Sequence, residues 1–251
     1  MFRLLILLLG LVLTTQANVI RVNDISDGRM INADTTNIEQ YPYLVSVRLD
    51  DEHYCVGSIL SERIILTGGM CLYGQSTSKL NIQYGMTKIG GDENIIAAEC
   101  FIVYPLFNPV NFDYNIGLII LSDDIPLSST AQPITLAENN PDAGIESTFI
   151  SWGSETDDTI LERSYLTTIT NPECSTQWPF FLKIEDYVLC AGIGDEMGNA
   201  CTGDGAAPLV VDGTLIGMLS WGGNCMLPDH SGVFTRIPYF LDWINNELSL
   251  L

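Results

Sequence analysis

The stretch HYCVGSILSERIILTGGMC, His53–Cys71, carries the first indication of the fold. Within it, the β-branched run Ile64–Thr67 ends at the turn-forming pair Gly68-Gly69. Similar short runs of β-branched and aromatic residues, each followed by turn residues, recur at Tyr43–Val47, Ile116–Leu121 and Leu215–Trp221. Short strands between turn signals are typical of an antiparallel sandwich or barrel, so the sequence predicts an all-β protein.

The C-terminal end has a different pattern, which predicts a helix. Pro238 stands where a first helical turn favours proline, and the apolar residues that follow fall on one helical face: Phe240, Trp243, Ile244 and Leu248. Farther upstream, the stretch Asp123–Pro133 contains serine and proline, and we expect it to link two β halves.

The N-terminus has the features of a secretory signal peptide. Arg3 precedes an apolar run, Leu4–Leu13, and small residues follow up to a predicted cleavage after Ala17. The run is too short to span a membrane, and no later stretch is long enough. We therefore expect a secreted protein, in an oxidising compartment where cysteines pair.

The chain is strongly acidic, with 10 Lys+Arg against 31 Asp+Glu and a net charge of −21. Loss of Arg3 with the signal peptide leaves 9 against 31, or −22. Nucleic acids and anionic membranes would be repelled, so neither is an expected partner. The charge permits a basic partner surface, and it suits equally well a soluble secreted protein that has none.

Several motifs resemble those of the trypsin-like serine proteases. His53–Cys71 resembles HFCGGSLISERWVLTAAHC, CTGDGAAPLV (Cys201–Val210) resembles CQGDSGGPLV, and SWGGNC…SGVFTRI (Ser220–Ile237) resembles SWGYGC…PGVYTRV. The segments LCAG (Leu189–Gly192) and ISWG (Ile150–Gly153) match further landmarks of the family. The matches run from Arg29 to the C-terminal helix and thus cover nearly the whole mature chain.

This resemblance implies two antiparallel Greek-key β-barrels followed by a C-terminal helix. The barrels would take residues 30–132 and 133–251, after a propeptide-like segment at residues 18–29. It also implies three disulfides, Cys55–Cys71, Cys174–Cys190 and Cys201–Cys225.

The resemblance locates the catalytic triad, and none of its three side chains is present. Met70 stands where the family has the histidine, Asn115 where it has the aspartate, and Gly205 where it has the serine. A thioether cannot accept a proton near neutral pH, an amide carries no charge to support an imidazolium, and glycine offers no nucleophile. We therefore expect no peptide hydrolysis by this mechanism, and no cofactor.

No small shift of the alignment restores the triad. The only two histidines, His53 and His230, cannot reach the required place without breaking the disulfide spacing, and Asp113 would point away. The oxyanion hole keeps Gly203 and Gly205. Three other glycines of the family are replaced around it, by Val56, Ala206 and Ala207, so we expect an altered backbone or a narrower cleft.

The resemblance also locates a substrate pocket and an activation site. Asn199 lies at the pocket base, without a charge for Arg or Lys, and its walls and neck would be formed by Ser220, Trp221, Gly222 and Gly232. We favour retention of these residues as scaffold over peptide binding. Cleavage between Arg29 and Met30 would create an amine that pairs with Asp204.

The seventh cysteine, Cys100, has no partner in this scheme. It precedes the apolar run Phe101–Val103, so we favour a buried free thiol over an intermolecular disulfide. Two distant histidines and paired cysteines offer no zinc spacing, and we expect no metal site.

A narrower resemblance concerns CLYGQSTSKLNIQYG, Cys71–Gly85, which is similar to the group 3 mite allergens and to the inactivated protease paralogues of the scabies mite. It implies a non-catalytic binding or decoy protein of the gut that interferes with host complement proteins. The alternatives are a residual or specialised serine endopeptidase and an inert secreted component.

Overall fold

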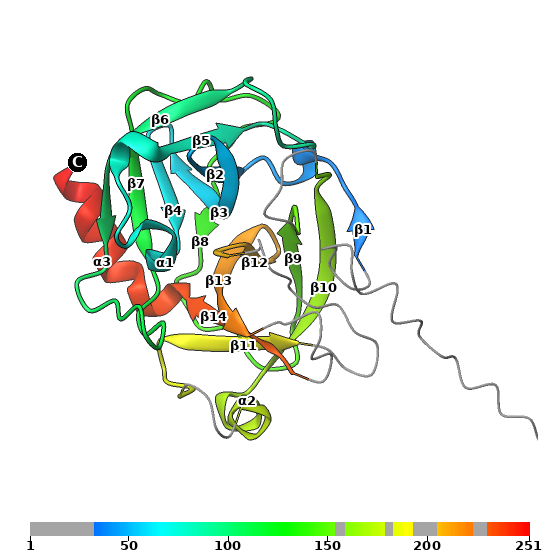
Figure 1. Ribbon diagram of the computed structural model, residues 1–251. Coiled ribbons are helices and arrows are strands. Elements are labelled where there is room, and N and C mark those ends of the chain that lie inside the picture. Colours follow the sequence, from blue (N-terminus) through cyan, green and yellow to red (C-terminus); the bar gives the residue numbers. More distant parts are fainter. Residues whose placement is uncertain (1–32, 154–158, 179–182, 193–204, 223–229) are drawn as a thin grey trace, which may run out of the picture.

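The computed structural model describes residues 33–153, 159–178, 183–192, 205–222 and 230–251, and shows two β-barrels packed side by side (Figure 1). The first barrel closes in the order β2-β3-β4-β7-β6-β5. Its strands are β2 (Leu44–Leu49), β3 (Glu52–Ser61), β4 (Ile64–Thr67), β5 (Leu80–Tyr84), β6 (Ile95–Val103) and β7 (Gly117–Leu121). It also carries the short helix α1 (Gly69–Leu72) and the 3-10 turns η2 (Ile38–Gln40) and η3 (Thr77–Lys79).

The second barrel closes because β9 pairs with both β10 and β12. Its strands are β9 (Glu146–Ser151), β10 (Glu162–Ile169), β11 (Val188–Gly192), β12 (Pro208–Val211), β13 (Thr214–Gly222) and β14 (Gly232–Arg236). Two short strands extend it, β1 (Asp34–Thr35) beside β10 and β8 (Thr135–Leu136) beside β13, and α2 (Asn171–Gln177) precedes β11. The predicted fold class, two antiparallel barrels with a C-terminal helix, is confirmed.

The strands form where apolar runs meet turn residues, as the sequence indicates. Ile64–Thr67 is β4 without change and is buried throughout, and Gly68-Gly69 follows directly as the entry to α1. The first barrel is packed tightly around Gly57, where a Cβ would lie 2.5 Å from Ile65 Cγ2 and 2.9 Å from Val45 Cγ2. A side chain at residue 57 would therefore collide with the barrel core.

The C-terminal helix α3 (Ile237–Leu250) returns from the second barrel to cover the first (Figure 1). Its buried face includes Phe240 and Ile244, and Trp243 is partly buried. The Phe240 and Trp243 rings both lie 5.2 Å from the ring of Tyr104, which follows β6. This helix therefore holds the two barrels together from outside. No helix of the described part is long and apolar enough to cross a membrane.

Two of the expected disulfides are present, Cys55–Cys71 and Cys174–Cys190. The third, Cys201–Cys225, lies outside the described residues. The expectation that Cys100 is buried is wrong, because its thiol is free and exposed on β6. The register of β6 against β7 shifts between Ala98 and Cys100, so neighbouring Glu99 and Cys100 both face outward instead of alternating.

Candidate functional site

The structure brings Met70, Asn115 and Gly205 together between the barrels. Met70 lies on α1 and Asn115 two residues before β7, while Gly205 comes from the second barrel. A Cβ at Gly205 would lie 3.9 Å from Met70 Cε, and a Cβ at Gly68 would lie 3.4 Å from Met70 Cγ and 3.3 Å from Asn115 Oδ1. The three residues therefore meet at one point, although they are far apart in the sequence.

Asn115 is the centre of the hydrogen bonding at this point. Its side chain is only 2% exposed, and its Oδ1 accepts a bond of 2.8 Å from the Met70 N–H. Its Nδ2 donates to Ser220 Oγ at 3.0 Å, and the Thr235 hydroxyl donates to its main-chain oxygen at 2.7 Å. A neutral amide, which both donates and accepts, satisfies these buried partners without placing a charge in the core.

The two histidines are held elsewhere. His53 lies on β3, buried, with Nδ1 2.7 Å from Ser46 Oγ and its ring against Trp152. The ring of His230 lies 4.7 Å from that of Trp178. The cluster of Met70, Asn115 and Gly205 thus contains no group that could take a proton from a nucleophile near neutral pH.

Asp113, the nearest carboxylate in the sequence, serves another purpose. It accepts hydrogen bonds from the Tyr187 hydroxyl at 2.5 Å and from Asn111 Nδ2 at 2.6 Å. Its side chain therefore faces a different part of the molecule and does not support a residue at the position of Met70.

The backbone after Gly205 takes an unusual conformation for its residues. Ala206 is fully buried with φ 65°, in the left-handed region that favours glycine. It is held there because its N–H donates to Leu219 O at 2.9 Å, while the Gly205 carbonyl accepts from the Val56 N–H at 2.8 Å. The alanine methyl lies 3.4 Å from where a Cβ at Gly68 would lie, so the added methyl occupies the space beside the cluster.

The wall residues of the expected pocket lie on β13 and β14. Ser220 is buried, and its Oγ accepts the hydrogen bond from Asn115 Nδ2. The ring centroids of Trp221 and Trp178 lie 5.5 Å apart. Gly222, with φ 77°, pairs with Gly232 across the two strands. Asn199, Gly203, Asp204, Arg29 and Met30 lie outside the described residues.

Sequence reasoning missed the part played by Trp178. Its Nε1 donates to Ser231 O at 3.1 Å, and its ring packs between Trp221 and His230. It follows α2, away from every motif of the resemblance, so no local signal identified it. Among the described residues, no three His, Cys, Asp or Glu side chains are grouped as metal ligands would be.

Comparison with known proteins agrees with this architecture. The Trypsin family profile matches residues 30–244. The chain is 30% identical over 236 residues to trypsin eta of Drosophila erecta, covering 88% of this chain and 91% of that protein. It is 28% identical over 234 residues to trypsin 5G1 of Aedes aegypti, covering 90% and 87%.

A solved structure shows the same fold. The scabies mite inactivated protease paralogue S-D1 superposes with a TM-score of 0.79 at 24% identity, over 87% of this chain and 97% of that one. With the family profile spanning both barrels, the chain belongs to the trypsin family of serine proteases and their homologues.

Proposed function

We propose that this chain is a secreted, proteolytically inactive trypsin homologue that acts by binding another protein. The observation that carries the proposal is the cluster of Met70, Asn115 and Gly205 at one point between the barrels. These are the residues that the family motifs place at the triad, and together they supply neither nucleophile, base nor charge.

The expected loss of turnover distinguishes this proposal from a residual endopeptidase. Removal of triad members in serine proteases lowers turnover by about 10⁶. Catalysis from an oxyanion hole alone leaves about 10³–10⁴ over water in such variants. Ala206, fully buried beside the cluster, holds a left-handed backbone directly after Gly205, where the family has a glycine.

The comparisons bear on both possible functions, a residual endopeptidase and an inactive binding protein. The curated relatives are trypsins at about 28–30% identity, which supports peptide cleavage as the family activity. The similar solved structure is described as an inactivated protease paralogue, which gives a precedent for this fold without the activity. The side chains at the cluster favour the second reading.

The test is a hydrolysis assay of the mature protein with peptide substrates carrying Arg, Leu or Phe before the cleaved bond. We expect no rate above that of a buffer blank and no labelling by a serine-directed fluorophosphonate. A rate that persists through further purification and falls in a Trp221→Ala variant would overturn the proposal, because a rate that depends on Trp221 must come from this protein and not from a contaminating protease.

The partner is the second part of the proposal. We propose a soluble host defence protein, complement components first, because the chain resembles the inactivated mite paralogues. Immobilised mature protein should capture such a component from plasma above an equally acidic secreted control protein. Capture of nothing beyond the control would remove this partner and leave an inert secreted protein as the better account.

A further inference from the structure

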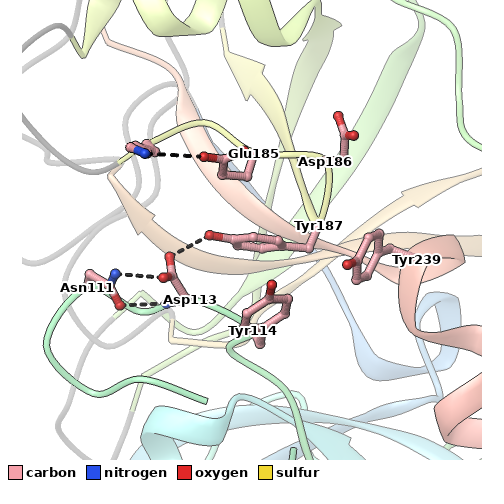
Figure 2. Close-up of a pocket in the computed structure, with 8 residues that line it drawn as sticks. Asn111, Asp113, Tyr114, Glu185, Asp186, Tyr187 and Tyr239 are labelled. Carbon is pink, nitrogen blue, oxygen red and sulfur yellow. Dashed lines mark hydrogen bonds and ion pairs between the residues drawn. The ribbon is translucent and has the colours of Figure 1, made fainter. Parts of the chain in front are cut away.

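A surface pocket shares no lining residue with the cluster of Met70, Asn115 and Gly205. It has a volume of about 670 Å³ and lies between the loop before β7, the segment before β11 and the first turn of α3 (Figure 2). It is lined by Asn111, Asp113, Tyr114, Lys183, Glu185, Asp186, Tyr187 and Tyr239. We call it the tyrosine–aspartate pocket.

Three tyrosine rings are grouped at this pocket. The ring centroids of Tyr114 and Tyr187 lie 4.3 Å apart, those of Tyr187 and Tyr239 6.0 Å, and those of Tyr114 and Tyr239 6.4 Å. Tyr187 is buried, whereas Tyr239 is 47% exposed and offers its ring to solvent. The face of an aromatic ring is electron-rich and attracts a cation within about 6 Å.

The carboxylates at the pocket have few cationic partners among the described residues. Within the part of the chain that the structure describes, the side-chain donors to Asp113 are neutral: the Tyr187 hydroxyl and Asn111 Nδ2. Burial and this bond to Asp113 raise the pKa of Tyr187, so the phenol stays a neutral donor. Lys183 lies 3.9 Å from Glu185, but its side chain is 87% exposed, and such surface pairs are weak.

The loop that carries Asp113 is held in a defined shape. Phe112 and Tyr114, on either side of it, both have left-handed backbones, with φ 57° and 54°. Bulky residues rarely adopt this conformation. It presents Asp113 and Tyr114 to the same pocket, as Figure 2 shows.

A second pocket of about 780 Å³ continues from the first, because Asp186 and Tyr239 line both. It adds the carboxylates of Glu138 and Asp142 and one cation, Arg236. The Arg236 guanidinium already donates to Val188 O and Asn171 Oδ1. The two adjoining pockets together thus hold five carboxylates against two cations.

We propose that the tyrosine–aspartate pocket binds the guanidinium or ammonium group of an arginine or lysine side chain, carried by a basic polypeptide segment that continues into the second pocket. The rings would contact the cation and the carboxylates would accept its hydrogen bonds. The pocket shares no residue with the triad positions, so this proposal stands whether or not the chain hydrolyses peptides.

The test is fluorescence anisotropy with a labelled Gly-Arg-Gly-Arg-Gly peptide at constant ionic strength. Glu185→Gln with Asp186→Asn should weaken binding about ten-fold, because two charges close to the cation are lost. Tyr239→Leu should weaken it about three-fold, because the ring is lost while apolar contact remains. The matched control is Asp92→Asn with Glu93→Gln, which removes the same charge from an exposed loop and should change affinity less than two-fold.

Equal weakening by the control pair would overturn the proposal, because binding would then follow net charge alone. Unchanged affinity in Tyr239→Leu, in a variant with an unchanged circular dichroism spectrum, would overturn it as well. A titration with N-methylguanidinium separates the sources of the cation. Weaker binding of this ion than of the peptide supports a polypeptide ligand, and equal binding would overturn the polypeptide part.

Discussion

Asn115→Asp restores the carboxylate that the family carries at the triad, and we expect it to destabilise this protein. Asn115 is 2% exposed, and its nearest partners are the Met70 N–H and the Ser220 hydroxyl. An aspartate could accept from both. In an active relative, the buried carboxylate has an imidazole beside it, whereas here the neighbour is a thioether.

The magnitude follows from two opposing effects. An uncompensated buried charge costs about 3–5 kcal/mol. Two hydrogen bonds to a charged acceptor recover about 1 kcal/mol more each than bonds to a neutral one. The difference leaves a loss of about 2 kcal/mol in the free energy of unfolding at pH 8.

The loss should depend on pH, because burial raises the pKa of the new carboxyl above its unfolded value of about 3.9. A group whose pKa is raised by folding destabilises once it ionises. The cost is therefore full above the raised pKa and disappears as the pH falls towards 4. Urea unfolding of the mature wild type and variant at pH 8 and at pH 4.5 measures this difference.

The double variant Met70→His with Asn115→Asp is the matched control. An imidazole at residue 70 can donate to the carboxylate, so the pair should show a favourable coupling of about 1–2 kcal/mol in a double-mutant cycle. A single Asn115→Asp variant as stable as wild type at pH 8, or a loss of the same size at both pH values, would refute the reasoning.

The other predictions concern packing, capping, Tyr187 and the free thiol. Gly57→Ala should cost about 1–3 kcal/mol in thermal unfolding, because its methyl would lie 2.5 Å from Ile65 Cγ2, and an unchanged melting temperature would contradict this. Thr170→Ala should cost about 1 kcal/mol, because the hydroxyl accepts from Glu173 N at 3.2 Å as the N-cap of α2, and chemical denaturation checks it. Folding raises the pKa of Tyr187. The free energy of unfolding should therefore fall as the pH rises above about 10, where this phenol ionises in the unfolded chain. Tyr187→Phe should reduce that fall, as denaturant unfolding from pH 9 to 11 would show. Native protein should react with about one equivalent of a thiol reagent, because Cys100 is free and exposed. Cys100→Ser should abolish the reaction. A wild-type protein that does not react would contradict an accessible thiol at this position.

Much of the fold could be predicted because its signals are local. A β-branched run that ends at two glycines predicts a strand at Ile64–Thr67, and the structure has β4 there. The helical face through Phe240 and Ile244 is likewise buried in α3. In both places, the period of the apolar residues matches the element that buries them.

The errors and omissions arise where distant segments meet. Cys100 was expected to be buried because its neighbours are apolar, but the register shift against β7 turns it outward. The tyrosine–aspartate pocket combines residues from three segments, and nothing near Asp113 in the sequence indicates Tyr187 or Tyr239. Hydrogen bonds and ring contacts of this kind depend on strand register and barrel packing, which local patterns do not encode.

The sequence by itself determined which chemical groups are available: a thioether, an amide and a bare glycine where the family motifs place the triad. Its local patterns predicted short strands between turns, and its resemblance to the family implied the two disulfides that the structure contains. Only the tertiary structure decided that Met70, Asn115 and Gly205 meet, that Asn115 is satisfied by Met70 and Ser220, and that Asp113 turns towards Tyr187. The reason is physical: side-chain chemistry belongs to each residue, whereas burial and hydrogen-bond partners are set by the packing of two barrels built from segments far apart in the chain.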